Sequence, residues 1–167
     1  MWVWVGFRRS VISSPRLPYD PKVDIAPITI IGTQPTVLVA STKLGVSTLP
    51  ELIAKLKQNP GKYNYASIGI GSISHISMEL VSLESGTEIV HIPYKGSPEA
   101  VTALIAGEVQ IAALPPISVI EHARAGTLRM LAVSMPKRWP LLPDVPTFTE
   151  AGLPEVQAQA WAAVGRF

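Results

Sequence analysis

A glycine turn between a short strand and a serine-capped helix constrains this chain more than any other stretch. Residues 62–67 (KYNYAS) follow an Asn-Pro-Gly breaker and alternate apolar with polar residues, which predicts a strand. Residues 68–71 (IGIG) predict a tight turn, and Ser72 is a good N-cap for a helix that stops before Gly86. The first N–H groups of a helix lack intrahelical partners and lie at the positive end of its dipole. This arrangement therefore predicts a binding site for a carboxylate.

Strand-like and helix-like segments alternate along the rest of the chain. We expect strands at 28–31, 36–40, 89–92, 109–114 and 128–134, and helices at 49–58, 97–106 and 117–125, with a short turn of helix near 148–151. In the helix after Ser72, the side chains spaced as on one helical face are Ile73, Ile76, Leu80 and Leu83, and we expect that face to be buried. The alternation predicts an α/β fold with a mostly parallel sheet and helices on both faces.

Composition and charge exclude several classes of protein and site. The chain has 167 residues, of which 47% are hydrophobic and 16% charged, which is typical of one globular domain with a sizeable core. A net charge of +2, with no stripe of lysines and arginines, argues against a nucleic-acid partner. The absence of cysteine excludes disulfides and thiolate zinc sites. No two of the three histidines have metal-ligand spacing with a carboxylate, so we expect no metal and no cofactor.

The first 35 residues do not follow the alternation. Residues 1–10 (MWVWVGFRRS) are apolar and then basic, without the charge-first order and cleavage site of a secretory signal. Their apolar run is far shorter than the roughly 20 residues that span a bilayer. Four prolines at 15, 18, 21 and 27 predict an extended connector over 11–27. We interpret 1–35 as an N-terminal segment and connector, 36–156 as the α/β domain, and 157–167 as a C-terminal return.

A set of short phrases between Tyr19 and Trp161 resembles one family of proteins. The phrases are YDP at 19–21 with Asp24, ELI at 51–53, NPGK at 59–62, NYAS at 64–67, GxGSxSH at 69–75, HxPYKG at 91–96, AGxLRxLAV at 125–133 and PDVPTFxEAG at 143–152. In this order they resemble the substrate-binding proteins of tripartite tricarboxylate transporters, also called the Bug family.

The resemblance implies a periplasmic solute receptor with the type II periplasmic-binding-protein fold, in which two lobes close on a small organic carboxylate. On this basis residues 36–156 are the second lobe, 1–35 are a remnant of the first lobe, and 157–167 are a truncated return to it. Main-chain N–H groups and hydroxyls would hold the ligand, and the membrane components of the transporter would receive it. The residues that the match assigns to ligand binding are Ser67, Gly71, Ser72, Ser74, His75, Tyr94 and Lys95.

The chain also departs from the family pattern. The first lobe's N-terminal strand and glycine-rich loop are absent. Leu114 stands where many members carry an acidic residue at the end of a strand, which weakens the case for a ligand with an ammonium group. A rival hypothesis is therefore a truncated interaction module that binds no ligand and forms a homodimer through the surface left by the missing lobe.

Several candidate residues also have plainer roles. Ser72 and Ser74 would each serve as helix-capping residues without a ligand, a role that contributes about 1 kcal/mol. His75 would equally bond a neighbouring loop, His91 is better interpreted as a packed core histidine, and Lys95 is equally a solvated turn residue. No acid–base pair and no complete nucleophile motif is present, so we expect the protein not to be an enzyme.

Overall fold

The computed structural model describes residues 2–5, 24 and 26–166, and its chain divides into two compact units. One unit consists of Met1–Gln34 with Gln159–Phe167, and the other is Pro35–Ala158. The α/β domain was expected to span 36–156, and its identification with one lobe is a separate prediction that this division alone does not test. The connector predicted for 11–27 lies mostly outside the described residues.

The smaller unit is a three-stranded sheet. Its strands are β1 (Trp2–Val5), β8 (Gln159–Arg166) and β2 (Ala26–Pro35), in the order β1-β8-β2. Strand β1 runs antiparallel to β8, with Trp2 opposite Gly165. On β2, Ile28 and Ile30 are 65% and 64% exposed. The small unit thus presents apolar side chains on an outer strand.

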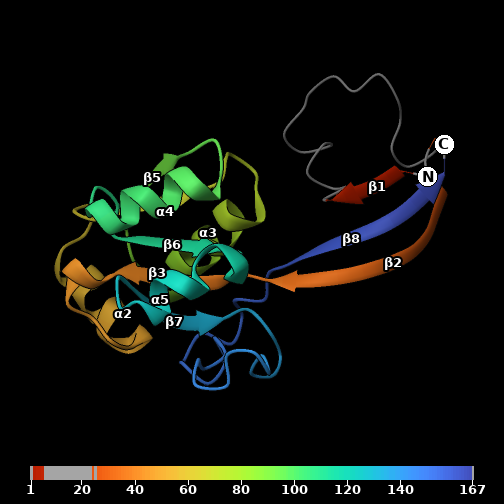
Figure 1. Cartoon of the computed structure of the whole chain (residues 1–167). Coiled ribbons are helices and arrows are strands. Elements are labelled where there is room, and N and C mark those ends of the chain that lie inside the picture. Colours follow the sequence, from red (N-terminus) through yellow and green to blue (C-terminus); the bar gives the residue numbers. More distant parts are fainter. Residues whose placement is uncertain (1, 6–23, 25, 167) are drawn as a thin grey trace. The chain divides into compact units, whose positions relative to one another are not determined.

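The larger unit is built on a five-stranded sheet (Figure 1). Its strands are β3 (Val37–Ser41), β4 (Asn64–Ser67), β5 (Val90–Pro93), β6 (Ile111–Leu114) and β7 (Leu128–Val133), in the order β5-β4-β6-β3-β7. Strand β4 is parallel to β5 and β6, whereas β3 is antiparallel to both β6 and β7. The α/β fold is confirmed, but the sheet is mixed rather than simply parallel. Strand β3 begins at the edge of the sheet where its neighbours β6 and β7 end.

Helices cover both faces of this sheet, as the alternation predicts (Figure 1). Helices α2 (Leu49–Gln58) and α3 (Ile73–Ser85) pack on one face. Helices α4 (Ser97–Ala106) and α5 (Ile120–Arg124) lie on the other. Alternate side chains of β3 serve the two faces, since Leu38 belongs to the first core cluster and Val37 and Val39 to the second. The helix expected at 117–125 is divided into a 3-10 turn, Pro116–Ser118, and α5.

The buried face of α3 differs from the predicted one. Ile76 is 44% exposed and Leu83 is 81% exposed, whereas the residues turned to the sheet are Ser74, Ser77, Met78, Val81 and Ser85. Serines are tolerated there because most of their hydroxyls have partners: Ser77 Oγ lies 3.2 Å from Thr36 Oγ1, and Ser85 Oγ donates to the Val81 carbonyl at 2.5 Å. Apolar spacing alone therefore indicated the wrong face.

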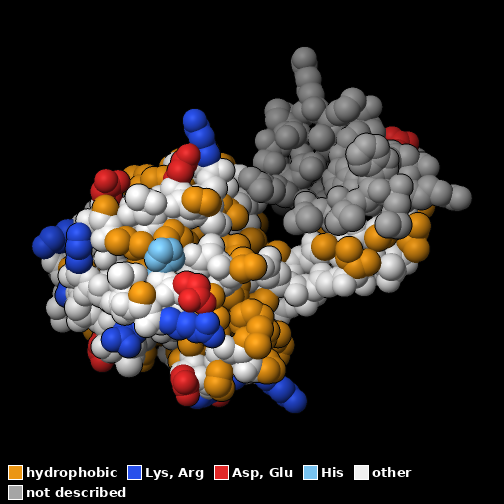
Figure 2. Space-filling model, viewed as in Figure 1, with side chains coloured by type: hydrophobic (Ala, Val, Ile, Leu, Met, Phe, Trp, Pro, Cys, Tyr) orange, Lys and Arg blue, Asp and Glu red, His pale blue; other side chains and the backbone are white. Residues whose placement is uncertain are grey.

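The surface charges and the lengths of the helices bear on two expectations from the sequence. On the face shown in Figure 2, lysine and arginine side chains of the larger unit are scattered among polar and apolar ones rather than gathered into a stripe. Within the described part of the chain, no helix combines the length and hydropathy that crossing a bilayer requires.

Candidate functional site

The predicted binding residues lie on two neighbouring loops at one edge of the five-stranded sheet. Strands β5, β4 and β6 are parallel, so their carboxyl ends meet at the same edge. Ser67 ends β4, Gly71 and Ser72 lie in the loop that leads into α3, and Ser74 and His75 are on the first turn of α3. The loop after β5 carries Tyr94 and Lys95. Loops at this edge of a parallel sheet are common places for ligand binding.

The turn and cap predicted before α3 are confirmed. Gly69 and Gly71 have φ angles of 118° and 72°, a left-handed region that glycine enters at little steric cost. Ser72 is the N-cap: its hydroxyl accepts a hydrogen bond from the His75 amide at 3.2 Å and donates to the Gly69 carbonyl at 2.6 Å. The Ser72 side chain is therefore already occupied by its structural role.

Most amides of the turn are also occupied. The Gly69 N–H donates to Ser67 Oγ at 3.3 Å, and the Gly71 N–H donates to His75 Nδ1 at 3.1 Å. The Ser72 N–H donates to the Gly69 carbonyl at 3.2 Å. After Ser72, the first amides without a partner among the described residues are those of Ile73 and Ser74. The donors available to an anion therefore lie on the first turn of α3 and not in the glycine turn.

Ser74 adds a further polar group to this first turn. Its side chain is fully buried, and its hydroxyl has no hydrogen-bond partner among the described residues. Ser74 is one of the residues that α3 turns toward the sheet, and it belongs to the same first turn as the free amides. A buried hydroxyl without a partner costs about 1–3 kcal/mol, and a bound oxygen atom would remove that cost.

Behind the turn, three rings form a stack that holds it in place. The His75 and His91 rings are stacked with centroids 4.2 Å apart, and Tyr65 stacks on His91 at 4.8 Å. His91 Nε2 lies 2.6 Å from Ser67 Oγ. Since His75 also accepts the Gly71 N–H, both histidines bond the turn, and Ser67 and His75 have structural contacts of their own.

The environment favours the neutral forms of His91 and Tyr65. Burial lowers the pKa of His91, the nearby His75 lowers it further, and Glu79 opposes the shift. The Tyr65 hydroxyl donates to the Glu79 carboxylate, and the pKa of Tyr65 is raised first by burial and then by Glu79. Because an N–H donor is directed at His75 Nδ1, that nitrogen is unprotonated in this arrangement.

The two candidates after β5 do not converge on the start of α3. Tyr94 packs against the core cluster on the α4 face of the sheet and lines a hollow of about 380 Å³ with Thr102 and Glu108. Burial raises the pKa of Tyr94, and Glu108 adds to the effect. Lys95 is exposed, and its backbone N–H donates to Glu99 Oε2 at 3.1 Å. Lys95 thus leaves a cationic side chain on the loop next to the glycine turn.

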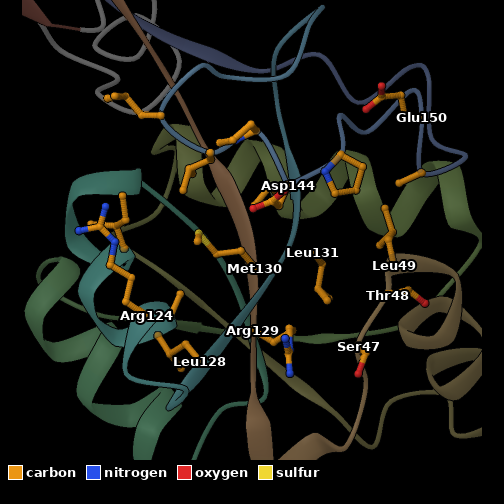
Figure 3. A pocket seen from close by; sticks show the side chains of 18 of the residues that line it. Ser47, Thr48, Leu49, Arg124, Leu128, Arg129, Met130, Leu131, Asp144 and Glu150 are labelled. Atoms are coloured by element: carbon orange, nitrogen blue, oxygen red, sulfur yellow. The ribbon is translucent and has the colours of Figure 1, made fainter.

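A larger hollow of about 780 Å³ lies beside β7 and contains none of the predicted binding residues (Figure 3). Two of its charged groups are already paired: Arg124 with Glu121 at 2.8 Å, and Glu150 with Arg138 at 2.9 Å. Arg129 is the cationic group in its wall for which the described residues supply no partner. Leu128, Met130 and Leu131 form an apolar part of its wall.

The helix that begins at this hollow, α2, is a poorer candidate for an anion site. Thr48 Oγ1 accepts from the Glu51 N–H at 3.4 Å, and the Ser47 N–H donates to Glu51 Oε2 at 2.8 Å. These bonds occupy the amides of Ser47 and Glu51, Pro50 has no N–H, and the Glu51 carboxylate places a negative charge at the start of α2. The first turn of α3 is therefore the better anion site of the two.

Sequence reasoning missed part of this arrangement. Tyr65, His91 and Glu79 support the site, and the free Ile73 amide belongs to it. One signal was present, since Glu79 lies four residues after His75 on the same helix, and His75 Nε2 lies 3.8 Å from Glu79 Oε1. Within the described residues, no group of three or more acidic or histidine side chains could hold a metal ion.

Comparison with known proteins adds an independent line of information. Residues 5–165 match the family described as the tripartite tricarboxylate transporter family receptor. BugT of Bordetella pertussis is 41% identical over 152 residues, which are 90% of this chain and 46% of that protein.

Solved structures of similar proteins agree with this family assignment. That of R. palustris Rpa4515 with adipate has a TM-score of 0.82 at 35% identity, over 88% of this chain and 49% of that one. MatC (Rpa3494) from Rhodopseudomonas palustris, with bound malate, has a TM-score of 0.84 at 28% identity, over 98% of this chain and 57% of that one. The chain thus spans about half the length of these relatives.

Proposed function

Because this chain belongs to the tripartite tricarboxylate transporter receptor family, we propose that it captures a small organic carboxylate for a transporter of that type. The family consists of solute receptors and not of enzymes. The fold is that of periplasmic binding proteins, of which the chain covers about half, or one lobe. Its structural relatives include the periplasmic binding protein BugD, so we propose that capture takes place in the periplasm.

The observation that carries the proposal is the set of unused donors at the start of α3. The amides of Ile73 and Ser74 have no partners among the described residues, and Ser74 Oγ is buried without one. Two N–H groups and a hydroxyl on one helical turn match the acceptors of a carboxylate, and the helix dipole favours its charge. Hydrogen bonds to a charged group contribute about 1.5–3 kcal/mol each, enough for weak binding by this turn alone.

The ring stack gives this donor set a fixed geometry. His75 and Ser67 hold the amides of Gly71 and Gly69, so the turn before α3 does not compete for the ligand. Lys95, on the adjacent loop, contributes a positive charge that attracts the anion. We propose that Ser74 contacts the ligand, and that Ser67, Gly71, Ser72 and His75 position the turn.

The test is a nuclear magnetic resonance titration of the ¹⁵N-labelled chain with adipate and with malate, at millimolar concentrations that detect weak binding. We expect the largest amide shifts at Ile73 and Ser74. Ser74→Ala should weaken binding about tenfold, which corresponds to the loss of one charge-assisted bond. Ser47→Ala is the matched control, because this serine precedes a helix whose start carries the Glu51 carboxylate. Absence of shifts, or shifts only around the hollow beside β7, would refute the proposal.

Self-association is the second candidate function, and exposed isoleucines favour it. Ile28 and Ile30 are 65% and 64% exposed on β2, an outer strand of the small sheet. Outer strands with apolar side chains are prone to pair with another chain. Light scattering across a range of protein concentrations tests this: a dimer that forms without any carboxylate response supports self-association in place of solute capture.

A further inference from the structure

We infer that the carboxylate bound by this chain has an apolar body, without hydroxyl or ammonium substituents. The inference rests on the proposed function and concerns the chemistry of the ligand beyond its carboxylate. Three features of the sheet edge carry it: two exposed isoleucines, the occupied hydroxyls, and the lack of acidic residues in the loops.

Two exposed isoleucines flank the start of α3. Ile70 lies in the turn after β4 and is 66% exposed, and Ile117 lies just after β6 and is 81% exposed. Strands β4 and β6 are parallel neighbours, with Ala66 opposite Ala112, so both loops emerge at the same edge. A carboxylate held by the Ile73 and Ser74 amides would extend its carbon chain along an apolar rim. Contact between the carbon chain of the ligand and these side chains would remove apolar surface from water, which favours binding.

Apart from Ser74, the serine hydroxyls at the end of β4 and on the loops after β4 and β6 are already occupied. Ser67 Oγ bonds His91, Ser72 Oγ bonds the backbone at both ends of its turn, and Ser118 Oγ donates to the Pro115 carbonyl at 2.7 Å. Ser74 is the remaining hydroxyl, and the carboxylate takes it. A hydroxyl group on the ligand would therefore lose its water partners against the isoleucines without gaining protein ones. Sites of this kind discriminate against added polar groups.

The loops directly after β4, β5 and β6 offer no acidic partner for an ammonium group. Residues 68–76, 94–96 and 115–119 contain no aspartate or glutamate, and β6 ends in Leu114 followed by two prolines. The nearest acidic residues in sequence are engaged: Glu79 accepts from the Tyr65 hydroxyl, and Glu99 accepts from the Lys95 amide. An amino-acid ligand would bring a positive charge to the free helix amides and to Lys95, with nothing to balance it.

The test compares three acids with the same six-carbon dicarboxylate chain: adipate, its tetrahydroxy form galactarate, and 2-aminoadipate. Dissociation constants come from the same amide titration of the full chain. We expect adipate to bind at least about tenfold more tightly than either substituted acid, as an unpaired polar group is rejected by more than a tenfold factor. Ile70→Ser and Ile117→Ser should each lower the ratio of the substituted acid's dissociation constant to that of adipate about threefold, because each removes an apolar contact.

Leu83→Ser is the matched control, because Leu83 is as exposed as Ile117 but lies at the far end of α3. It should leave the adipate preference unchanged. Equal or tighter binding of galactarate or 2-aminoadipate would overturn the inference and leave the proposed function intact. A preference that survives both isoleucine substitutions, or that Leu83→Ser also narrows, would overturn the role of the rim. Failure of all three acids to bind would overturn the proposed function, and the inference with it.

Discussion

Thr36 joins the sheet to α3, and its replacement by valine measures how much that buried hydroxyl network contributes. Thr36 Oγ1 donates to Ser134 Oγ at 3.0 Å and lies 3.2 Å from Ser77 Oγ, and all three side chains are buried. Valine has the same shape, so no cavity forms. The bond from the Thr36 N–H to Ser134 Oγ, at 2.8 Å, also remains.

The expected loss of stability follows from the contacts removed. Each of the two hydroxyl bonds contributes about 1 kcal/mol, and the buried Ser77 hydroxyl also loses the Thr36 oxygen as its partner. Thr36→Val should therefore lower the free energy of unfolding by about 2–3 kcal/mol. Urea denaturation followed by circular dichroism at 222 nm reports on this unit, because all described helices lie within Pro35–Ala158.

Thr102→Val is the control for this measurement. Thr102 is exposed on α4, and its hydroxyl donates to the Pro98 carbonyl of its own helix at 3.0 Å. Its replacement should change the free energy of unfolding by less than about 0.5 kcal/mol. If Thr36→Val unfolds at the same urea concentration as the parent chain, or if both variants lose the same amount, the reasoning about the network is wrong.

Two further predictions concern the ring stack and the orientation of α3. The pKa of His91 is lowered below 6.5 in the folded chain, so the unfolded chain binds its proton more readily, and stability should fall as the pH drops through that value. His91→Gln should flatten this part of a stability–pH profile. Met78→Ala should cost about 2–5 kcal/mol because Met78 is fully buried, whereas Leu83→Ala should cost less than about 0.5 kcal/mol at 81% exposure. Similar losses from both substitutions would contradict the orientation of α3.

Local patterns in the sequence predicted local structure well. Helix α3 is capped by Ser72 and ends at Gly86, and helix α2 is capped by Thr48. Each of these residues acts through contacts with residues close to it in the sequence. The buried face of α3 was wrong because hydrophobic spacing treats serine as a surface residue. The partners that make Ser77 suitable for burial, such as Thr36, lie far away in the sequence.

The sequence predicts which loop carries the candidate site, but it does not predict which atoms are available there. The binding of a carboxylate at the start of α3 stays a prediction. Which amides stay free depends on His75, whose Nδ1 accepts the Gly71 N–H and so moves the available donors to Ile73 and Ser74. Tyr94 was grouped with these residues because it follows a neighbouring strand. Its side chain turns to the α4 face, which loop sequence alone does not specify.

The position of β3 between β6 and β7 also affects the order in which the larger unit assembles. This strand comes first in the unit, yet its two neighbours are β6 and β7, which a ribosome produces last. A nascent chain therefore carries β3 with both edges unsatisfied while α2, β4, α3 and β5 are being made. Long-range pairing of this kind slows folding and leaves aggregation-prone strands exposed in the meantime. Truncation before Leu128 should consequently leave a species that chaperones retain.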